Sequence, residues 1–171
     1  ALVGSPNVGK SVMFNNLTGS YVTVSNYPGT TVEVSRGKCR IGDEEFEVID
    51  TPGIFKERRA SLGGILEARV HEAMQEIDLI IYVADPTRSL GPEERYLLSL
   101  VRKLSIPKLL VINKSDLPES AKEWREDYRA LAPEFDGVFE LSAERNRHIQ
   151  PLIARVFALL IGMAESLSAS F

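Results

Sequence analysis

The chain has 171 residues, 44% of them hydrophobic and 26% charged, and its formal net charge is −4 at pH 7. This length fits one domain with a single core, and the composition is ordinary for a soluble globular protein. The negative charge gives no electrostatic reason to expect nucleic acid or an anionic membrane surface as the main partner. The single cysteine, Cys39, excludes an internal disulfide and is predicted to be an inert packing residue in a strand.

Three features of the chain bear on its domain organisation. The apolar stretches 77–84 and 152–164 are shorter than the roughly 20 residues that a bilayer requires, so no transmembrane span is expected. The chain opens at Ala1 as if inside a strand and without a signal peptide, which is compatible with a fragment of a longer protein, membrane part included. No repeat or linker divides the sequence, so residues 1–171 are interpreted as one domain.

The predicted elements alternate between strands and helices. In chain order we expect a strand ending at residue 3, a helix over 10–17, a hairpin of strands over 32–41 and 44–49, a helix over 66–75, a strand over 77–84, a helix over 92–104, a strand over 109–112, a helix over 121–131, a strand over 138–141 and a closing helix over 149–167. Continuous apolar runs such as 77–84 are typical of strands buried on both faces of a parallel sheet. The pattern therefore predicts an α/β fold, with a mostly parallel six-stranded sheet, one antiparallel strand and helices on both faces. Ligands of such sheets bind at the carboxyl ends of the strands.

The first motif lies between the first strand and the first helix. Residues 4–11 read Gly-Ser-Pro-Asn-Val-Gly-Lys-Ser and match the phosphate-binding P-loop pattern. Gly4 and Gly9 allow successive N–H groups to turn towards an anion at the helix N-terminus. Lys10 can reach the β- and γ-phosphates and act in catalysis, while Ser11 offers a hydroxyl to Mg²⁺. The residues expected to bind the phosphates are Asn7, Val8, Gly9, Lys10, Ser11 and Val12.

Two further segments complete the predicted phosphate site. Asp50 begins an Asp-Thr-Pro-Gly segment at a strand end, where it can hold Mg²⁺ through a water while the Gly53 amide contacts the γ-phosphate. The segment 25–33 carries a threonine that can place a second hydroxyl on Mg²⁺ when a γ-phosphate is present, as in the switch of GTPases. Thr31 is favoured over Thr30 for this role. The predicted Mg²⁺ ligands are Ser11, Thr31 and Asp50, and the predicted catalytic residues are Lys10, Thr31 and Gly53.

A second motif predicts which base is bound. Asn113 to Asp116 read Asn-Lys-Ser-Asp after an apolar strand. Asp116 can accept two hydrogen bonds from guanine, whereas adenine lacks that donor pair and would leave the carboxylate unpaired. Asn113 can tie this loop to the P-loop, the Lys114 stem can cover the base, and the Ala143 N–H can meet the guanine O6. A helix N-cap at Ser115 or Asp116 is the alternative, and it can coexist with base binding. The residues expected to bind guanine are Asn113, Lys114, Asp116, Ser142 and Ala143.

Taken together, these motifs resemble the five guanine-nucleotide motifs of a Ras-like P-loop NTPase G domain. The subgroup signal lies in residues 7–11, 14–19 and 26–33, where Asn-x-Pro-Gly-x-Thr-Val-Glu is the most specific part. These segments resemble the FeoB family of ferrous-iron transporters. The resemblance implies a cytosolic GTPase domain at the inner face of the plasma membrane, attached to a membrane permease, with nucleotide state regulating Fe(II) uptake. Its expected ligands are GTP or GDP and Mg²⁺, and no nucleic acid is expected.

Two positions depart from the FeoB pattern. Thr51 stands where that family usually has leucine, and Lys114 where it usually has methionine. The family's helical domain is also missing after the G domain. The second half of the chain is more similar to the Era family of ribosome-assembly GTPases, so an Era-like GTPase associated with RNA is the alternative function. A nucleotide-dependent scaffold without hydrolysis is a third interpretation.

The sequence also predicts how GTP hydrolysis proceeds. Ile54 follows Gly53 where Ras-like proteins have a water-orienting glutamine, and its side chain forms no hydrogen bond, so slow intrinsic turnover is expected. In GTPases with a similar loop, an asparagine in the place of Asn7 helps to hold K⁺ beside the phosphates. The resemblance therefore implies K⁺-stimulated hydrolysis through Asn7 and carbonyls of 21–30, with a simple turn residue at Asn7 as the alternative.

Overall fold

The computed structural model describes residues 1–5, 7–18, 22–26, 33–51 and 76–170. Within them, seven strands form one sheet in the order β2-β3-β4-β1-β5-β6-β7. The strands are β1 (Leu2–Val3), β2 (Val22–Asn26), β3 (Glu33–Ile41), β4 (Glu44–Asp50), β5 (Ile80–Ala84), β6 (Lys108–Ile112) and β7 (Val138–Glu140). The helices are α1 (Lys10–Leu17), α3 (Pro92–Arg102), α4 (Arg125–Arg129) and α5 (Gln150–Ala169), with 3₁₀ turns η2 (Glu119–Ala121) and η3 (Ala132–Glu134).

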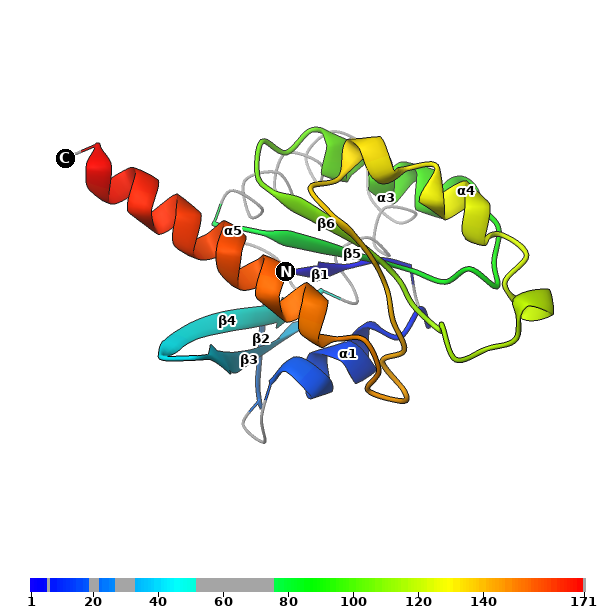
Figure 1. Ribbon diagram of the computed structural model, residues 1–171, viewed down its shortest axis with the longest axis horizontal. Coiled ribbons are helices and arrows are strands. Elements are labelled where there is room, and N and C mark those ends of the chain that lie inside the picture. Colours follow the sequence, from blue (N-terminus) through cyan, green and yellow to red (C-terminus); the bar gives the residue numbers. More distant parts are fainter. Residues whose placement is uncertain (6, 19–21, 27–32, 52–75, 171) are drawn as a thin grey trace.

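The sheet carries helices on both faces, as Figure 1 shows, and this arrangement confirms the predicted α/β fold. Every residue of β5 is buried, because its alternate side chains enter two different cores. Ile80 and Tyr82 belong to a hydrophobic cluster that includes residues of α3 and α4. Ile81 and Val83 belong to a second cluster, which includes residues of α1 and α5. This two-sided burial explains why the strand reads as a continuous apolar run.

The pairing around the sheet is parallel except at one strand. β1 pairs in parallel with β4 and β5, and β6 pairs in parallel with β5 and β7. β3 runs antiparallel to both β2 and β4, and Gly42 turns the β3–β4 hairpin with φ 62°. The single antiparallel strand is therefore as predicted, and the other six strands have their carboxyl ends at the same edge of the sheet.

The prediction of six strands misses β2, whose last two residues overlap the predicted switch segment 25–33. The four residues of β2 from Thr23 to Asn26 are all exposed, so no apolar alternation marks this strand in the sequence. Its pairing with β3 comes from the backbone, in a register that places Val24 opposite Ser35. An edge strand of this kind leaves no hydrophobic period for sequence analysis to detect.

Other boundaries differ where tertiary contacts override local pattern. β5 begins at Ile80 rather than at residue 77, and the helix predicted over 121–131 is reduced to η2 and the five residues of α4. The Trp124 N–H donates to the Pro86 carbonyl at 3.0 Å, which interrupts a continuous helix. The predicted helix over 66–75 lies outside the described residues. Cys39 is buried as predicted, and burial raises the pKa of its thiol.

The closing helix α5 is longer and more apolar than expected. An 18-residue window of this 20-residue helix has a mean hydropathy of 1.7, so by length and composition alone the helix meets the requirement for a membrane span. The sequence analysis expected no segment long and apolar enough to span a membrane, and α5 corrects that expectation by length and composition alone. One face of α5 packs on the sheet, with Leu152 fully buried and Ile153 and Val156 partly buried against the same cluster. A core helix of a soluble protein passes the same test of composition, so the helix is weak evidence for a membrane.

Candidate functional site

The P-loop joins the end of β1 to the start of α1, and its two glycines are required by close contacts. Gly9 has φ 100°, and a Cβ there would collide with the Asn113 side-chain amide. A Cβ on Gly4 would collide with the carbonyl oxygen of Val83 in the neighbouring strand. Asn7 is exposed and adopts φ 64°, a left-handed conformation that asparagine tolerates better than most residues. The loop therefore has the turn geometry that the motif predicts.

Lys10 is the buried charged residue of the P-loop, with 5% of its surface exposed. Its Nζ donates to the carbonyl oxygens of Gly4 at 2.8 Å and Ser5 at 2.7 Å, which holds the ammonium inside the curve of the loop. Val8 is buried beneath the loop, whereas Val12 on α1 is 42% exposed. The ammonium is thus placed where the motif requires a cation for phosphate oxygens.

Two oxygen-bearing side chains meet beside the P-loop. The Ser11 hydroxyl donates to Asp50 Oδ2 at 3.3 Å. Asp50 is 3% exposed, and its Oδ1 is buried with no hydrogen-bond partner among the described residues. Burial raises the pKa of Asp50, although the Lys10 charge and the Ser11 hydrogen bond oppose that shift. Mg²⁺ prefers oxygen ligands, and these two side chains fit the ion. The other predicted members of the phosphate site, Thr31 and Gly53, lie outside the described residues, as does Ile54.

Asn113 connects three loops at the carboxyl edge of the sheet. It is 3% exposed, and its side-chain N–H donates to the Val8 carbonyl oxygen at 2.9 Å, as expected for a link to the P-loop. Its Oδ1 accepts from the Ala143 N–H at 3.0 Å. A guanine O6 at this position would therefore compete with Asn113 for the Ala143 N–H, a competition that the sequence does not reveal.

Asp116 lies opposite the last loop of the site. Its Oδ1 accepts from the Ser142 hydroxyl at 2.7 Å, and this hydrogen bond is the main cause that lowers the pKa of Asp116. The carboxylate is therefore ionised at neutral pH and able to accept donors from a base. The alternative interpretation as a helix N-cap is wrong, because the next helical turn, η2, begins after Pro118 and has no side-chain cap.

The sequence interpretation missed Asp85, which pairs with Lys114. Asp85 directly follows β5, its side chain is 3% exposed, and its Oδ2 accepts from Lys114 Nζ at 2.6 Å. Lys114 itself adopts φ 60°. The available signal was an aspartate at the end of a continuous apolar strand, at the edge where ligands bind.

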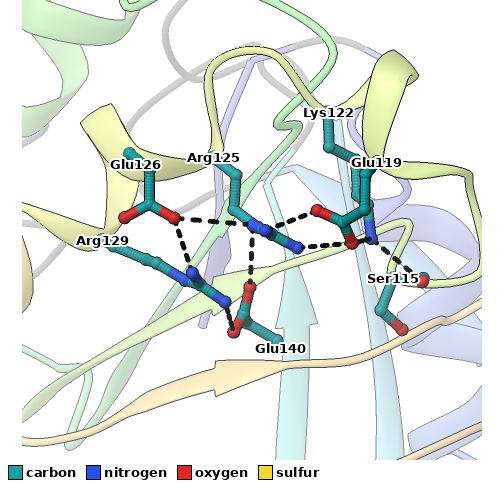
Figure 2. A network of polar contacts seen from close by, with 7 residues as sticks. All are labelled: Ser115, Glu119, Lys122, Arg125, Glu126, Arg129 and Glu140. Carbon is teal, nitrogen blue, oxygen red and sulfur yellow. Dashed lines mark hydrogen bonds and ion pairs between the residues drawn. The ribbon is translucent and has the colours of Figure 1, made fainter.

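A charged network lies behind the base-binding loops, and Figure 2 shows how it connects them. It consists of Glu119, Lys122, Arg125, Glu126, Arg129 and Glu140. At one end Lys122 Nζ donates to the Ser115 carbonyl oxygen at 3.3 Å, within the loop that carries Asp116. At the other end Arg129 pairs at 2.6 Å with Glu140, the last residue of β7 before the Ser142 loop. Glu119 and Glu126 are largely exposed, so their individual ion pairs contribute little stability.

The fold and the site together define a P-loop nucleotide-binding domain with a G-domain arrangement of loops. A family model described as 50S ribosome-binding GTPase matches residues 1–114. The chain belongs to this GTPase family. Members of such a family bind GTP and GDP, with Mg²⁺, and hydrolyse GTP.

Curated relatives of the chain are longer than it is. GTPase Der of Rickettsia bellii (strain OSU 85-389) is 38% identical over 161 residues, which cover 94% of this chain and 34% of the relative. GTPase Era of Thermoanaerobacter sp. (strain X514) is 32% identical over 167 residues, covering 94% of this chain and 53% of the relative. The chain therefore spans between about a third and half of the length of these relatives.

Solved structures similar to the chain include members of both families that the sequence resembles, FeoB and Era. The G domain of the T. maritima FeoB iron transporter matches with a TM-score of 0.67 and 26% identity, over 93% of this chain and 96% of that one. Era in complex with MgGDPNP and a segment of 16S ribosomal RNA matches with a TM-score of 0.70 and 27% identity, over 92% of this chain and 55% of that one. The likeness is to the G domains and does not separate the two groups.

Replacing Asn113 by alanine is expected to destabilise the fold by about 3 kcal/mol, since it leaves the buried Val8 carbonyl and Ala143 N–H unpaired. Urea unfolding followed by circular dichroism measures the loss. Asn26→Ala, on the exposed strand β2, is the matched control and is expected to change stability by less than about 0.5 kcal/mol. Equal, small losses in both variants would mean that Asn113 does not hold the loops together.

Proposed function

We propose that the loops at the carboxyl ends of β1, β6 and β7 bind GTP and that the chain hydrolyses it. The observation that carries this proposal is the bridge made by Asn113, which fixes the phosphate loop against the two base loops. Lys10 binds the β- and γ-phosphates, assisted by the P-loop amides of residues 7–12. Asp116 accepts from the guanine edge, with Ser142 orienting its carboxylate. Thr31 and Gly53, outside the described residues, complete the γ-phosphate site.

Mg²⁺ is held in this proposal by Ser11 and by Asp50, with Thr31 as the third side chain. The support is the 3.3 Å contact between Ser11 Oγ and Asp50 Oδ2 and the buried second oxygen of Asp50. When bound, Mg²⁺ supplies positive charge to the phosphate oxygens. The test of the whole site is hydrolysis of GTP and ATP by the chain with MgCl₂. Turnover selective for GTP is expected, and turnover of ATP at a similar rate would refute the base assignment.

Hydrolysis is proposed to be slow and stimulated by K⁺ bound at Asn7. The exposed, left-handed Asn7 supports this, because its side chain is accessible at the mouth of the P-loop. Of the residues 21–30, whose carbonyls are expected to contribute to the K⁺ site, residues 22–26 form the edge strand β2, which pairs with β3. The remaining positions of that range lie outside the described residues.

In KCl the rate of GTP hydrolysis is expected to exceed that in NaCl by about tenfold, since a cation beside the phosphates stabilises developing charge. Asn7→Ala is expected to remove this difference while leaving the NaCl rate unchanged. Phosphate release is measured at constant ionic strength in both salts. Equal rates in the two salts for the unaltered chain would leave Asn7 as a turn residue only.

The biological role proposed first is that of the cytosolic, nucleotide-dependent domain of a FeoB-like ferrous-iron transporter at the inner face of the plasma membrane. Support comes from the segments 7–11, 14–19 and 26–33 and from the likeness to the FeoB G domain over nearly its whole length. The test is Fe(II) uptake by cells that depend on the full-length protein. Asp116→Asn is expected to lower Fe(II) uptake, because the domain no longer binds GTP, and to leave protein abundance unchanged. Unaltered Fe(II) uptake would reject the role.

The second candidate is an Era-like or Der-like GTPase acting on the ribosome. Its support is the identity of 32% to 38% with curated GTPases of those names and the lysine at position 114, where the FeoB pattern has methionine. Co-sedimentation of the full-length protein with ribosomal subunits in the presence of a non-hydrolysable GTP analogue tests it. Binding that depends on the nucleotide would favour this role over iron transport.

A further inference from the structure

Asp85 is a buried carboxylate at the ligand-binding edge that the five guanine-nucleotide motifs do not include. It directly follows β5, and its side chain is 3% exposed. Its Oδ1 accepts from the Thr87 N–H at 2.9 Å and from the Thr87 hydroxyl at 2.6 Å, so one oxygen serves the local turn. Its second oxygen is thereby directed away from the turn and towards the base loop.

That second oxygen receives the Lys114 ammonium. Asp85 Oδ2 accepts from Lys114 Nζ at 2.6 Å, and Arg88 Nε lies at 3.4 Å. Burial alone would raise the pKa of Asp85, but the hydrogen bonds from Lys114 and Thr87 outweigh it and lower the pKa. The Asp85 carboxylate is therefore ionised at neutral pH, and a charge-assisted hydrogen bond of this kind is among the strong ones.

Lys114 is held both at its backbone and at its ammonium. Its backbone is held in a left-handed conformation with φ 60° directly after Asn113, which is itself bonded to the P-loop. Its ammonium is held at the end of β5. A lysine without such a contact populates many rotamers, and ordering it costs conformational entropy when a ligand binds. The Asp85 contact makes part of that ordering independent of the ligand.

We propose that Asp85 is a positioning residue for base binding, which holds the Lys114 ammonium so that its methylene stem lies along the face of the nucleobase. The inference rests on the base site proposed above and deepens it. Asp116 reads the edge of the base, whereas Lys114 covers the face, which all purines share. Loss of Asp85 therefore weakens binding of every purine nucleotide equally and leaves the choice between them unchanged.

The test is a double-mutant cycle between Asp85 and Lys114, measured as the dissociation constants of GDP and IDP with MgCl₂. Asp85→Asn keeps an oxygen for the Thr87 donors and removes the charge that holds Lys114. It is expected to raise the dissociation constants of GDP and IDP by about tenfold each, because the stem is no longer ordered. In a Lys114→Met background, where no ammonium needs a partner, the same change is expected to have an effect below about twofold.

Thr87→Val is the matched control, because it removes a hydrogen bond to Asp85 but leaves the Lys114 contact, and affinity is expected to stay within about twofold. Equal weakening by Asp85→Asn in both backgrounds, or no weakening in either, would overturn the inference. If thermal melts show that Asp85→Asn does not fold, Asp85→Ser enters the same cycle with the same criteria. If the unaltered chain binds neither nucleotide, the proposed function itself fails. If the chain binds GDP with the same affinity whether or not Asp85 is replaced, only the role of Asp85 fails.

Discussion

Replacing Lys10 by alanine is expected to lower the rate of GTP hydrolysis by at least about a hundredfold, the usual cost of losing a preorganised charge or donor at the reacting phosphates. The ammonium is buried within the P-loop and already directed inward by two carbonyl oxygens. No other described cation touches that loop in the same way, so no neighbouring side chain takes its place. Phosphate release under saturating GTP, together with GDP affinity, measures the loss.

Lys108→Ala is the matched control for Lys10. Its Nζ also donates to two carbonyl oxygens, those of Leu104 at 2.5 Å and Ile106 at 3.1 Å, but it lies at the amino end of β6, far from the nucleotide edge. Its loss is expected to affect stability and leave hydrolysis within about twofold. A Lys10→Ala chain that hydrolyses GTP at the unaltered rate would show that the P-loop is not the phosphate site.

The features that could be predicted from the sequence are those in which a structural requirement restricts the residue type at each position. The P-loop required glycine at Gly9 because only that residue fits against Asn113, and the motif encodes the requirement directly. β5 could be predicted because burial on both faces leaves no polar position along it. In both cases the tertiary constraint restricts the residue types within one short segment, so the sequence of that segment reveals it.

The parts that could not be predicted depend on contacts between distant segments. β2 exists because its backbone pairs with β3, and its exposed side chains carry no sign of that pairing. Asp85 lies 29 positions before Lys114, so the local sequence around either residue does not predict the ion pair. The competition between Asn113 and a guanine O6 for the Ala143 N–H is likewise a property of loop geometry, since the two residues are 30 positions apart.

The charged network behind the base loops shows a third limit of sequence analysis. Four of its six residues lie within 121–131, which the sequence predicts as one helix. In the structure Lys122 instead turns inward to the Ser115 carbonyl, and Arg129 reaches across to Glu140 (Figure 2). The same charges thus connect two loops, and the helix between them is reduced to the five residues of α4.

Replacing Asp116 by asparagine is expected to raise the dissociation constant of GDP by roughly a hundredfold or more, because two charge-assisted hydrogen bonds to the guanine edge are lost or reversed. The asparagine oxygen still accepts the ring N–H, but its amide then faces the exocyclic amine of guanine, donor against donor. Xanthine carries an oxygen in place of that amine, so the variant is expected to bind xanthosine diphosphate more tightly than GDP.

Competition of GDP, xanthosine diphosphate and ADP against a fluorescent nucleotide measures this exchange of preference. Asp127→Asn, the same change at an exposed position on α4, serves as the control and is expected to leave all three affinities unaltered. The reversal is more informative than the loss of affinity, because a disturbed loop would weaken all bases together. The Ser142 hydroxyl can donate to the side-chain oxygen at position 116 in both the aspartate and the asparagine form, so the side chain keeps its place. An Asp116→Asn chain that still prefers GDP would therefore show that the guanine edge binds elsewhere.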